Sequence, residues 1–496
     1  MEQSQVFKQL FVGGDLSGIQ KFLYNISSKK AAVSLKGRSC YLRKLMENVC
    51  SDIKQAAEAS GAETVEELYC SGGKFYLLTD NTPQILEAVE QCAKQAKRKL
   101  WEEHRGQLGM NISCVAFNEH PDGTVDCQDA PRQKPGYLWK MANAEFAHQK
   151  SQKFKEILTD SYQEFFEPIA VGGKPKVCAV TGIESPDCVM IPAEGEDADM
   201  YVLPSVYQQI QEGEKLSRED GFKTFKDYAE NTDLGILRMD VDGLGKRFVV
   251  GFDSIGQYKV FSKRLVDFFE EGTRKMQQEE EFKPYLNIIY AGGDDLFVVG
   301  RWDKVIDFAE RIQQETKERF SSDGITISGG IAVVQPKFPI SKAAELAGNA
   351  EDAAKQFHDG EKNAFHMLGK TISWENEFDY VKSFKQKFVS MIKDYGLSKG
   401  ILHKLMLYSS IADSNKLRRK EGKQEDFSYI WHISYYLTRY IKRYESNKNK
   451  TVCDFCSSLR DKEIDYRKGR NLELIALAAR WAELELKDNI NNLNTL

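Results

Sequence analysis

Two stretches of the chain decide its fold: Leu234–Asp242 (LGILRMDVD) and Tyr285–Gly300 (YLNIIYAGGDDLFVVG). The first is an apolar run that ends in two aspartates, two residues apart. The second consists of two runs rich in β-branched and aromatic residues on either side of a Gly-Gly pair, which predicts two strands joined by a tight turn. Because side chains alternate along a strand, we expect Asp240 and Asp242 to share one face of the first strand's end.

The elements around these strands follow a defined order. Apolar residues at helical spacing predict helices over Gln257–Gln278, Asp303–Phe320 and Ile340–Phe357, and the run Ile325–Val334 (ITISGGIAVV) predicts a further strand. The order is strand, helix, strand, strand, helix, strand. This is the order of a split βαβ unit, so we predict a domain of the ferredoxin-like kind.

The same order occurs near the N-terminus, which predicts an internal duplication. The two hairpins align without a gap, YCSGGKFYLL on YAGGDDLFVV, so that Gly73 and Lys74 stand where Asp294 and Asp295 stand. We therefore expect two related domains, of which only the second keeps the acidic pair. The elements predicted for the first domain are strand Leu10–Asp15, helix Arg38–Ala59, hairpin Leu68–Thr79, helix Pro83–His104 and strand Met110–Phe117.

Together these elements predict an α+β fold with two ferredoxin-like domains, an inserted linker domain and an α-helical C-terminal domain. The linker segment is rich in turn formers and acidic residues. After Trp374 the sequence becomes helical, with apolar clusters at Ile401–Ile411, Tyr429–Ile441 and Leu472–Leu486. The predicted boundaries are 1–146 for the first ferredoxin-like domain, 147–231 for the linker, 232–375 for the second ferredoxin-like domain and 376–496 for the helical domain.

The composition is that of a globular protein, with 41% hydrophobic residues and a net charge of −5. The charge is unevenly distributed, because residues 376–496 hold 23 lysines and arginines against 16 acidic residues. A basic C-terminal part is suited to contact RNA or an acidic partner. The sequence has no run of eighteen apolar residues and no basic-then-apolar N-terminus, and its ten cysteines are scattered. We therefore expect a cytoplasmic protein without a membrane partner.

Acidic residues at the ends of neighbouring strands carry the chemistry. Residues opposite each other on adjacent strands lie about 4.5–5.5 Å apart. Asp240, Asp294 and Asp295 can therefore share two divalent cations about 3.5–4 Å apart, the separation that two-metal phosphoryl transfer uses. Oxygen ligands of this kind favour magnesium or manganese. Gly292 and Gly293 lack a Cβ, so a triphosphate or ribose can approach the backbone closely. Four like charges at one strand edge are costly without a cation.

These motifs resemble a known family. LRMDVDGLGKRF, YAGGDDLFVVG and TISGGIAVV are similar to the palm domain shared by GGDEF-type cyclases and the large catalytic subunit of type III CRISPR effector complexes. GDLSGIQKFLY (14–24), SLKGRSCYLRKL (34–45) and SGGKFYLL (71–78) resemble that subunit's degenerate first palm. ISWENEF (372–378) resembles its transition into a helical C-terminal domain. The resemblance covers nearly the whole chain, and the combination of GDLSGIQ with GGDD is specific.

The resemblance implies an RNA-activated nucleotidyl cyclase that makes a cyclic oligoadenylate, or a related AMP-containing messenger, from ATP. Two ATP molecules would bind between the two palms. The 3′-hydroxyl of one would attack the α-phosphate of the other and release pyrophosphate, with two metal ions stabilising the attacking and leaving oxygens. The implied partners are ATP, other subunits of a CRISPR ribonucleoprotein, and guide and target RNA, the RNA mostly through those subunits.

The resemblance also assigns roles to residues of this chain. The implied catalytic residues are Asp240, Asp294 and Asp295, which also bind metal together with the carbonyl of Val241. Lys355 matches the lysine that such palms direct at the triphosphate. The implied nucleotide-binding residues are Asp15, Ser17, Gly18, Ser71, Gly72, Gly73, Gly292, Gly293, Ser328 and Lys355.

Two features depart from the family's pattern. Many members begin with an HD nuclease domain, but only about ten residues precede the first predicted strand, and the sole His-Asp pair, His358-Asp359, is interpreted as a helix end. We therefore expect no DNase activity. Family inserts often carry paired CxxC motifs, and a closed zinc site needs four ligands. We do not expect zinc here, because the only candidate ligands are the widely spaced Cys178, Cys188, Cys453 and Cys456.

Two alternative functions stay open. The first is a free-standing GGDEF-like cyclase that makes a guanine dinucleotide, against which stands the fused degenerate palm that supplies both halves of a site in one chain. The second is a catalytically silent scaffold that binds RNA and partners, against which stand the intact DVD and GGDD motifs. The preference for adenine rests on the resemblance alone. A basic cluster at Lys416, Arg418, Arg419 and Lys420, predicted to be a loop, is either an RNA contact or a solvated surface.

Overall fold

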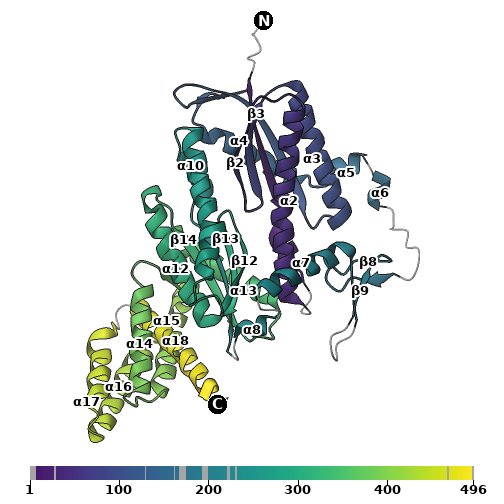
Figure 1. Ribbon diagram of the computed structural model, residues 1–496. Coiled ribbons are helices and arrows are strands. Elements are labelled where there is room, and N and C mark those ends of the chain that lie inside the picture. Colours follow the sequence, from purple (N-terminus) through teal and green to yellow (C-terminus); the bar gives the residue numbers. More distant parts are fainter. Residues whose placement is uncertain are drawn as a thin grey trace.

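The computed structural model describes residues 7–26, 30–128, 130–160, 162–166, 175–192, 199–220, 224–229, 232–465 and 469–493. Two six-stranded sheets dominate it, with strand orders β2-β3-β1-β4-β5-β6 and β12-β13-β11-β14-β15-β16. The first four strands of each order form the antiparallel sheet of a ferredoxin-like domain, so the predicted α+β fold with two such palms is confirmed. Figure 1 shows the two palms one above the other, with the helical C-terminal domain beside the second.

The first palm has its helices on both sides of the sheet. Its elements are β1 (Gln9–Ser17), α1 (Ile19–Tyr24), α2 (Ala31–Ala59), β2 (Val65–Ser71), β3 (Lys74–Asp80), α3 (Pro83–His104), β4 (Gly109–Glu119), β5 (Val125–Cys127), β6 (Ala130–Gln133) and α4 (Gly136–Ser151). Helix α2 begins seven residues before the predicted start at Arg38. Its first turn contains small and apolar residues, and Ala31 and Leu35 pack in one cluster with Ile236 and Phe297 of the second palm.

The second palm repeats this order and adds a hairpin at one edge. Its elements are β11 (Leu234–Val241), α9 (Leu244–Val250), α10 (Ile255–Val266), the π-helix η1 (Asp267–Gly272), α11 (Thr273–Gln277), β12 (Leu286–Gly292), β13 (Asp295–Arg301), α12 (Trp302–Phe320), η2 (Ser321–Asp323), β14 (Ile327–Val334), α13 (Ile340–Lys355), η3 (Phe357–Gly360), β15 (Ala364–Met367) and β16 (Lys370–Ser373). Strand β15 runs parallel to β14 and pairs with it at two positions.

The strand registers of the two palms match around their hairpin turns. Asp15 lies opposite Lys74 in β3, as Asp240 lies opposite Asp295 in β13. Both hairpins have a shift in pairing register at the same place in their first strand. It lies between Glu67 and Tyr69 in the first palm and between Ile288 and Tyr290 in the second. The alignment of Lys74 with Asp295, made from the sequence, therefore agrees with the register of the sheets.

One helix of each palm contacts the sheet of the other palm. Helix α2 of the first palm contacts β12 of the second, and α10 of the second palm contacts β2 of the first. Figure 1 shows both helices running from one palm to the other. The two sheets are thereby held with their hairpin turns facing each other, which brings the acidic turn of the second palm against the turn of the first.

The linker contacts both palms, because its helix α7 (Pro204–Asp220) packs on α2 and its helix α8 (Phe225–Ala229) packs on β13 and β11. Helix α7 lies along α2, where Gly37 and Gly213 each leave room for the backbone of the other helix: a Cβ on Gly37 would lie 1.8 Å from the carbonyl oxygen of Gln209. Its elements are α5 (Lys155–Asp160), α6 (Tyr162–Phe166), β7 (Lys176–Val177), β8 (Glu184–Ser185), β9 (Val189–Ile191), β10 (Met200–Val202), α7 (Pro204–Asp220) and α8 (Phe225–Ala229). The predicted boundary at residue 146 falls inside α4, which ends at Ser151.

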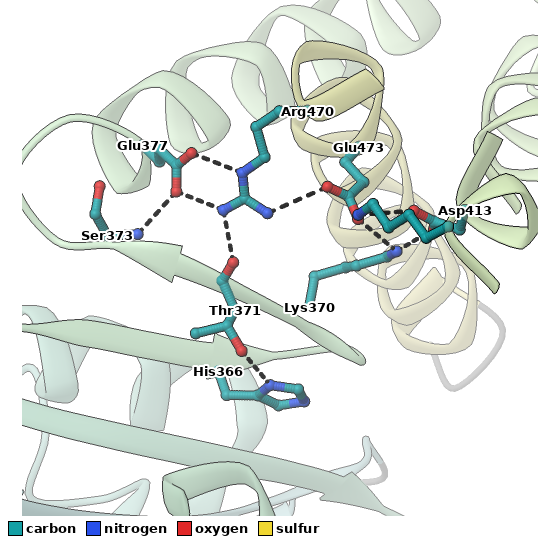
Figure 2. Close-up of polar contacts among 9 residues, drawn as sticks. His366, Lys370, Thr371, Ser373, Glu377, Asp413, Arg470 and Glu473 are labelled. Carbon is teal, nitrogen blue, oxygen red and sulfur yellow. Dashed lines mark hydrogen bonds and ion pairs between the residues drawn. The ribbon is translucent and has the colours of Figure 1, made fainter. Parts of the chain in front are cut away.

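The C-terminal domain consists of helices, as predicted after Trp374. They are α14 (Phe378–Lys393), α15 (Gly400–Lys420), α16 (Ser428–Ser446), α17 (Lys450–Ser458), η4 (Leu459–Glu463) and α18 (Gly469–Leu493). A network of charged side chains joins this domain to β16, as Figure 2 shows. Arg470 of α18 donates to Glu377 at 2.7 and 2.5 Å and to the carbonyl oxygen of Thr371 at 2.7 Å. Lys370 of β16 contacts Asp413 and Glu473 of α15 and α18.

The prediction that the basic cluster 416–420 forms a loop is wrong, because these residues are the last turns of α15. Two of its four cations already have carboxylate partners. Lys416 lies 2.7 Å from Glu473, and Arg419 pairs with Glu425 at 2.8 Å. Leu417 is the only apolar residue of the cluster and is exposed. Among the described helices, none is long and apolar enough to cross a membrane.

Candidate functional site

Three carboxylates meet where β11 and β13 end. Asp240 is the residue before the last of β11 and lies opposite Asp295, the first residue of β13. The amide of Val241 donates to the carbonyl oxygen of Asp294 at 3.2 Å, which ties the turn to the strand end. One carboxylate oxygen from each of Asp240, Asp294 and Asp295 lies within 4.8 Å of the others. In the part of the chain that the structure describes, this is the one group of three or more such ligands.

Burial and mutual repulsion make this cluster electrostatically unfavourable. Burial and the charge of Asp295 raise the pKa of Asp240 to about 7. Burial and the neighbouring carboxylates likewise raise the pKa of Asp294 and of Asp295 to about 6. A divalent cation would relieve this repulsion, and the three side chains offer only hard oxygen ligands. The residues present therefore fit magnesium or manganese.

Lys355 is the cation that partly neutralises the cluster. Its Nζ lies 2.5 Å from Oδ2 of Asp240 and 2.6 Å from Oε1 of Glu351. Although burial lowers its pKa, the two carboxylates raise it above the ordinary lysine value. Glu351 is 4% exposed and is held by Arg238 at 3.0 Å. The sequence indicated Lys355, but Glu351 and Arg238 were missed, because neither belongs to a motif and only the fold brings them together.

Asp242 lies outside the cluster of three carboxylates, although its hydrogen-bond partner Ser328 lies opposite Asp240 and therefore on the same face of the sheet. Strand β11 ends at Val241, and the chain then turns away. Oδ2 of Asp242 accepts hydrogen bonds from Thr326 at 2.8 Å, from Ser328 at 2.9 Å and from the amide of Asn363 at 3.0 Å. Ser328, predicted to bind nucleotide, is fully buried and donates to Asp242. Three carboxylates, not four, face one another.

The turns of the two palms touch each other. A Cβ on Gly72 would lie 2.8 Å from the carbonyl oxygen of Gly292, and a Cβ on Gly293 would lie 2.6 Å from the hydroxyl of Tyr69. The amide of Gly293 donates to Oγ of Ser71 at 2.8 Å, and Ser71 in turn donates to Glu270 of the π-helix η1. Ser71, predicted to bind nucleotide, thus holds the backbone of the acidic turn from the other palm.

The first palm has a related but differently charged site. Asp15 is buried and its Oδ2 lies 2.8 Å from Nζ of Lys150, in the way that Asp240 pairs with Lys355. Asn111, opposite Asp15 in β4, donates to the same oxygen at 3.3 Å. Burial and Asp240 raise the pKa of Asp294, and the charge of Lys74 across the interface offsets part of this rise. Lys150 was missed, because it lies on a helix that follows an additional hairpin.

The other predicted residues of the first palm lie at the same end of its sheet. Ser17 ends β1, and its hydroxyl donates to the carbonyl oxygen of Gly109 at 3.0 Å. Gly18 adopts φ +92° and precedes α1. Gly73 has φ +78° and its carbonyl accepts from the amide of Leu16 at 2.8 Å. These three positions shape the backbone at this end of the first palm's sheet.

The four cysteines named as zinc candidates lie in two places. Cys178 is buried in the linker, where its sulfur accepts from the amides of Thr181 at 3.4 Å and Leu203 at 3.5 Å, and Cys188 packs beside the same cluster. Cys453 and Cys456 lie on α17 in another hydrophobic cluster. The backbone of His358-Asp359 forms the short turn η3, and its side chains lie outside the described residues.

The comparisons with known proteins agree with this geometry. A family model for Csm1 subunit domain B matches residues 8–169, and one for the second palm domain of Cas10/Cmr2 matches residues 233–366. The chain belongs to the Cas10/Csm1 family. The second model covers β11 to β15, and therefore all three clustered carboxylates and Lys355.

Two relatives illustrate the extent of the match. Both are Cas10/Csm1 proteins described as single-strand-specific deoxyribonucleases of subtype III-A CRISPR systems. The one from Enterococcus italicus is 27% identical over 458 residues, which is 78% of this chain and 57% of the relative. The one from Mycobacterium tuberculosis is 26% identical over 465 residues, 76% of this chain and 56% of the relative. The chain thus spans little more than half the length of these curated relatives.

Solved Cas10/Csm1 structures share the fold. A Csm1–Csm4 cassette in complex with pppApA has a TM-score of 0.66 and 17% identity, and the match covers 96% of this chain and 69% of that one. A Csm1–Csm4 cassette in complex with cA4 has a TM-score of 0.63 and 17% identity, covering 95% of this chain and 70% of that one. At this identity the likeness shows the fold alone.

Proposed function

We propose that this chain is the nucleotidyl cyclase subunit of a type III CRISPR complex and makes cyclic oligoadenylate, or a related AMP-containing messenger, from ATP. The observation that carries the proposal is the cluster of Asp240, Asp294 and Asp295 at a strand end that faces a second, differently charged palm in the same chain. Such an arrangement provides one metal-binding half and one half without the acidic pair. Each half would hold one nucleotide.

The two halves have different tasks. Asp240, Asp294, Asp295 and the carbonyl of Val241 would hold two magnesium or manganese ions, which supply charge neutralisation at the attacking and leaving oxygens when bound. Lys355 contacts both Asp240 and Glu351. When nucleotide and metal bind, its ammonium group would leave Asp240 and contact a phosphate group. Gly292 and Gly293 would let the triphosphate approach the backbone.

In the first palm Lys74 brings a positive charge to a position that holds a carboxylate in the second. A cation there favours phosphate over a metal ion. Asp15, Ser17 and Gly18, with Ser71, Gly72 and Gly73, would form the backbone and polar wall of the second nucleotide's place. Solved structures of relatives contain one ATP, AMPPNP or cA4 in a Csm1–Csm4 cassette, which supports an adenine nucleotide as the substrate.

The two alternatives make different demands on the site. A free-standing GGDEF-like enzyme would need a second copy of this chain for its other half, whereas here the second half is fused and its turn touches the acidic turn. A silent scaffold would gain nothing from three partly buried carboxylates whose desolvation and mutual repulsion raise their pKa values. Partner subunits and guide and target RNA belong to the proposal, with RNA acting as the activator.

Pyrophosphate release tests the assignment of the site. The complex, assembled with its partner subunits, guide RNA and target RNA, is given ATP and magnesium. The double variant Asp294→Ala/Asp295→Ala should release no pyrophosphate above background while assembling normally. Glu361→Ala, at an exposed carboxylate in the same palm, is the matched control and should release it at the wild-type rate. Wild-type release from the double variant would refute the assignment.

A further inference from the structure

The first palm has an open sheet edge. Strand β4 pairs with β1 from Gly109 to Phe117, but with β5 only at Phe117–Glu119. Among the described residues, no strand pairs with the other edge of β4 from Gly109 to Val115. An open edge displays a row of unpaired amides and carbonyls, which is a template for a further strand.

A cleft follows this edge. A cavity of about 900 Å³ is lined by β4 from Gly109 to Val115 and by facing residues of α3 and α4. Helix α5 closes one end, because Glu156 pairs with Lys97 at 2.6 Å and Asp160 with Lys94 at 2.5 Å. The lysines of the α3 wall are thus already neutralised by carboxylates. The cleft is therefore a backbone-lined slot with balanced charge.

One side chain at this edge takes the place of a strand. Gln149 of α4 accepts from the amide of Ile112 at 3.1 Å and donates to the carbonyl oxygen of Ile112 at 2.7 Å. A carboxamide that pairs both groups of one residue imitates the peptide group of a neighbouring strand. Because backbone direction alternates along a strand, the amides and carbonyls of Met110 and Cys114 point to the same side as those of Ile112. In the described part of the chain they have no such substitute.

The second palm shows what occupies the matching edge. Asn111 lies opposite Asp15, and Ser328 lies opposite Asp240, so Ile112 corresponds to Gly329. Gly329 pairs with Phe365 of β15, which runs parallel to β14. At the position where the second palm uses a strand of its own chain, the side chain of Gln149 is the one partner that the described residues of the first palm provide.

We propose that the cleft between α3 and α4 receives an extended segment of a partner protein subunit, which adds to the first palm as a strand beside β4. The seven residues from Gly109 to Val115 offer an edge of about 23 Å at 3.3 Å per residue. The amides and carbonyls that β4 turns toward the cleft recur at every second residue, which is the spacing of the main-chain groups of an extended peptide. Nucleic acid is disfavoured because the neighbouring lysines are paired with Glu156 and Asp160. Without that segment, Gln149 hydrogen-bonds to Ile112 at the edge.

This inference rests on the proposed assembly with partner subunits and not on the cyclase reaction. Amide hydrogen exchange is measured on the chain alone and on the assembled complex. The amides of Met110 and Cys114 should exchange at least about tenfold more slowly in the complex, since each gains a hydrogen bond in a strand ladder. Equal exchange in an intact complex overturns the inference, while failure to form any complex overturns the proposed assembly instead. Equal protection by RNA without partner proteins also overturns it.

A pair of variants on α4 tests the cleft directly. Ala144 is exposed and lines the cleft, so Ala144→Trp should fill it and weaken assembly at least about tenfold. Ala147 is exposed on the same helix but lies outside the lining, so Ala147→Trp should assemble like the wild type. Gln149→Ala removes the substitute for a strand and should leave assembly equal or tighter. Wild-type assembly of Ala144→Trp, with its fold confirmed by circular dichroism, contradicts the inference.

Discussion

The three carboxylates make the metal-free protein sensitive to pH. Their pKa values in the folded chain, about 7 for Asp240 and about 6 for Asp294 and Asp295, lie above the ordinary value for aspartate. The folded state therefore binds protons more tightly than the unfolded state. The stabilising contribution of protonation is complete below about pH 4, the unfolded pKa, and is lost as the pH rises through 6 to 7.

The first prediction follows from the raised pKa values of these carboxylates in the folded state. Without metal, wild-type stability should fall as the pH is raised from 5 to 8. Asp295→Asn, which removes one buried charge, should be about 1–2 kcal/mol more stable than the wild type at pH 8 and show a smaller dependence on pH. Urea unfolding in EDTA at pH 5.5 and pH 8 measures both. With magnesium at pH 8, the wild type should instead be more stable than Asp295→Asn. A variant that is less stable than the wild type in EDTA at pH 8 contradicts the electrostatic account.

Contact between the two hairpin turns is the second feature that can be tested. Gly72 has φ +58° and no room for a Cβ, which would lie 2.8 Å from Cα of Gly293. Gly72→Ala should push the acidic turn out of place and lower cyclase activity by about 100-fold, as expected for a displacement of about 1 Å. Gly61 has φ +90° and open space around it.

Gly61→Ala is the matched control, because it carries the same backbone strain of about 1–2 kcal/mol without touching the site. Activity is measured as pyrophosphate release by the assembled complex. If both variants lose activity equally, the loss comes from backbone strain and not from the contact between the palms.

Elements with strong local patterns could be predicted from the sequence, and those defined by tertiary contacts could not. The strand that ends at Asp240 and the GGDD hairpin were found because their apolar runs and turn residues are local signals. The β15–β16 hairpin was missed, because its two four-residue strands are defined by pairing with β14. The hydrogen bonds of Asp242 could not be predicted for a related reason. Its partners Thr326, Ser328 and Asn363 lie 84 to 121 residues away in the chain.

The network in Figure 2 predicts how firmly the helical domain is attached. Arg470 satisfies Glu377, Glu473 and the carbonyl of Thr371 at once. Arg470→Ala would remove the one side chain that joins these three acceptors, although Glu473 keeps Lys370 and Lys416 and Glu377 keeps the amide of Ser373, and should destabilise α18 by about 2–3 kcal/mol. Arg480→Ala on the same helix removes only an exposed pair with Glu483 and should cost less than about 1 kcal/mol. Native-state hydrogen exchange on α15 and α18 measures both, and equal effects would show that the network does not hold the domain.

The charge of the C-terminal domain bears on how the protein meets RNA. Lys416 and Arg419 are already paired with carboxylates, so only Arg418 and Lys420 of the basic cluster remain without an ion pair among the described residues. If both contact RNA phosphates, Arg418→Ser/Lys420→Ser should reduce the slope of log affinity against log salt by about 1.4 for a single strand. Binding of the assembled complex to target RNA at several salt concentrations measures the slope. An unchanged slope would show that the cluster is a solvated helix end.

The central claim is that two unequal palms in one chain form a single site for making an adenine messenger. Its most direct test is mass spectrometry of the products formed by the complex with guide RNA, target RNA, magnesium and isotopically labelled ATP and GTP. The account predicts cyclic oligoadenylate, or another AMP-containing product, that depends on target RNA and is absent for Asp294→Ala/Asp295→Ala. A guanine dinucleotide, or no product from an intact complex that binds both RNAs, would contradict it.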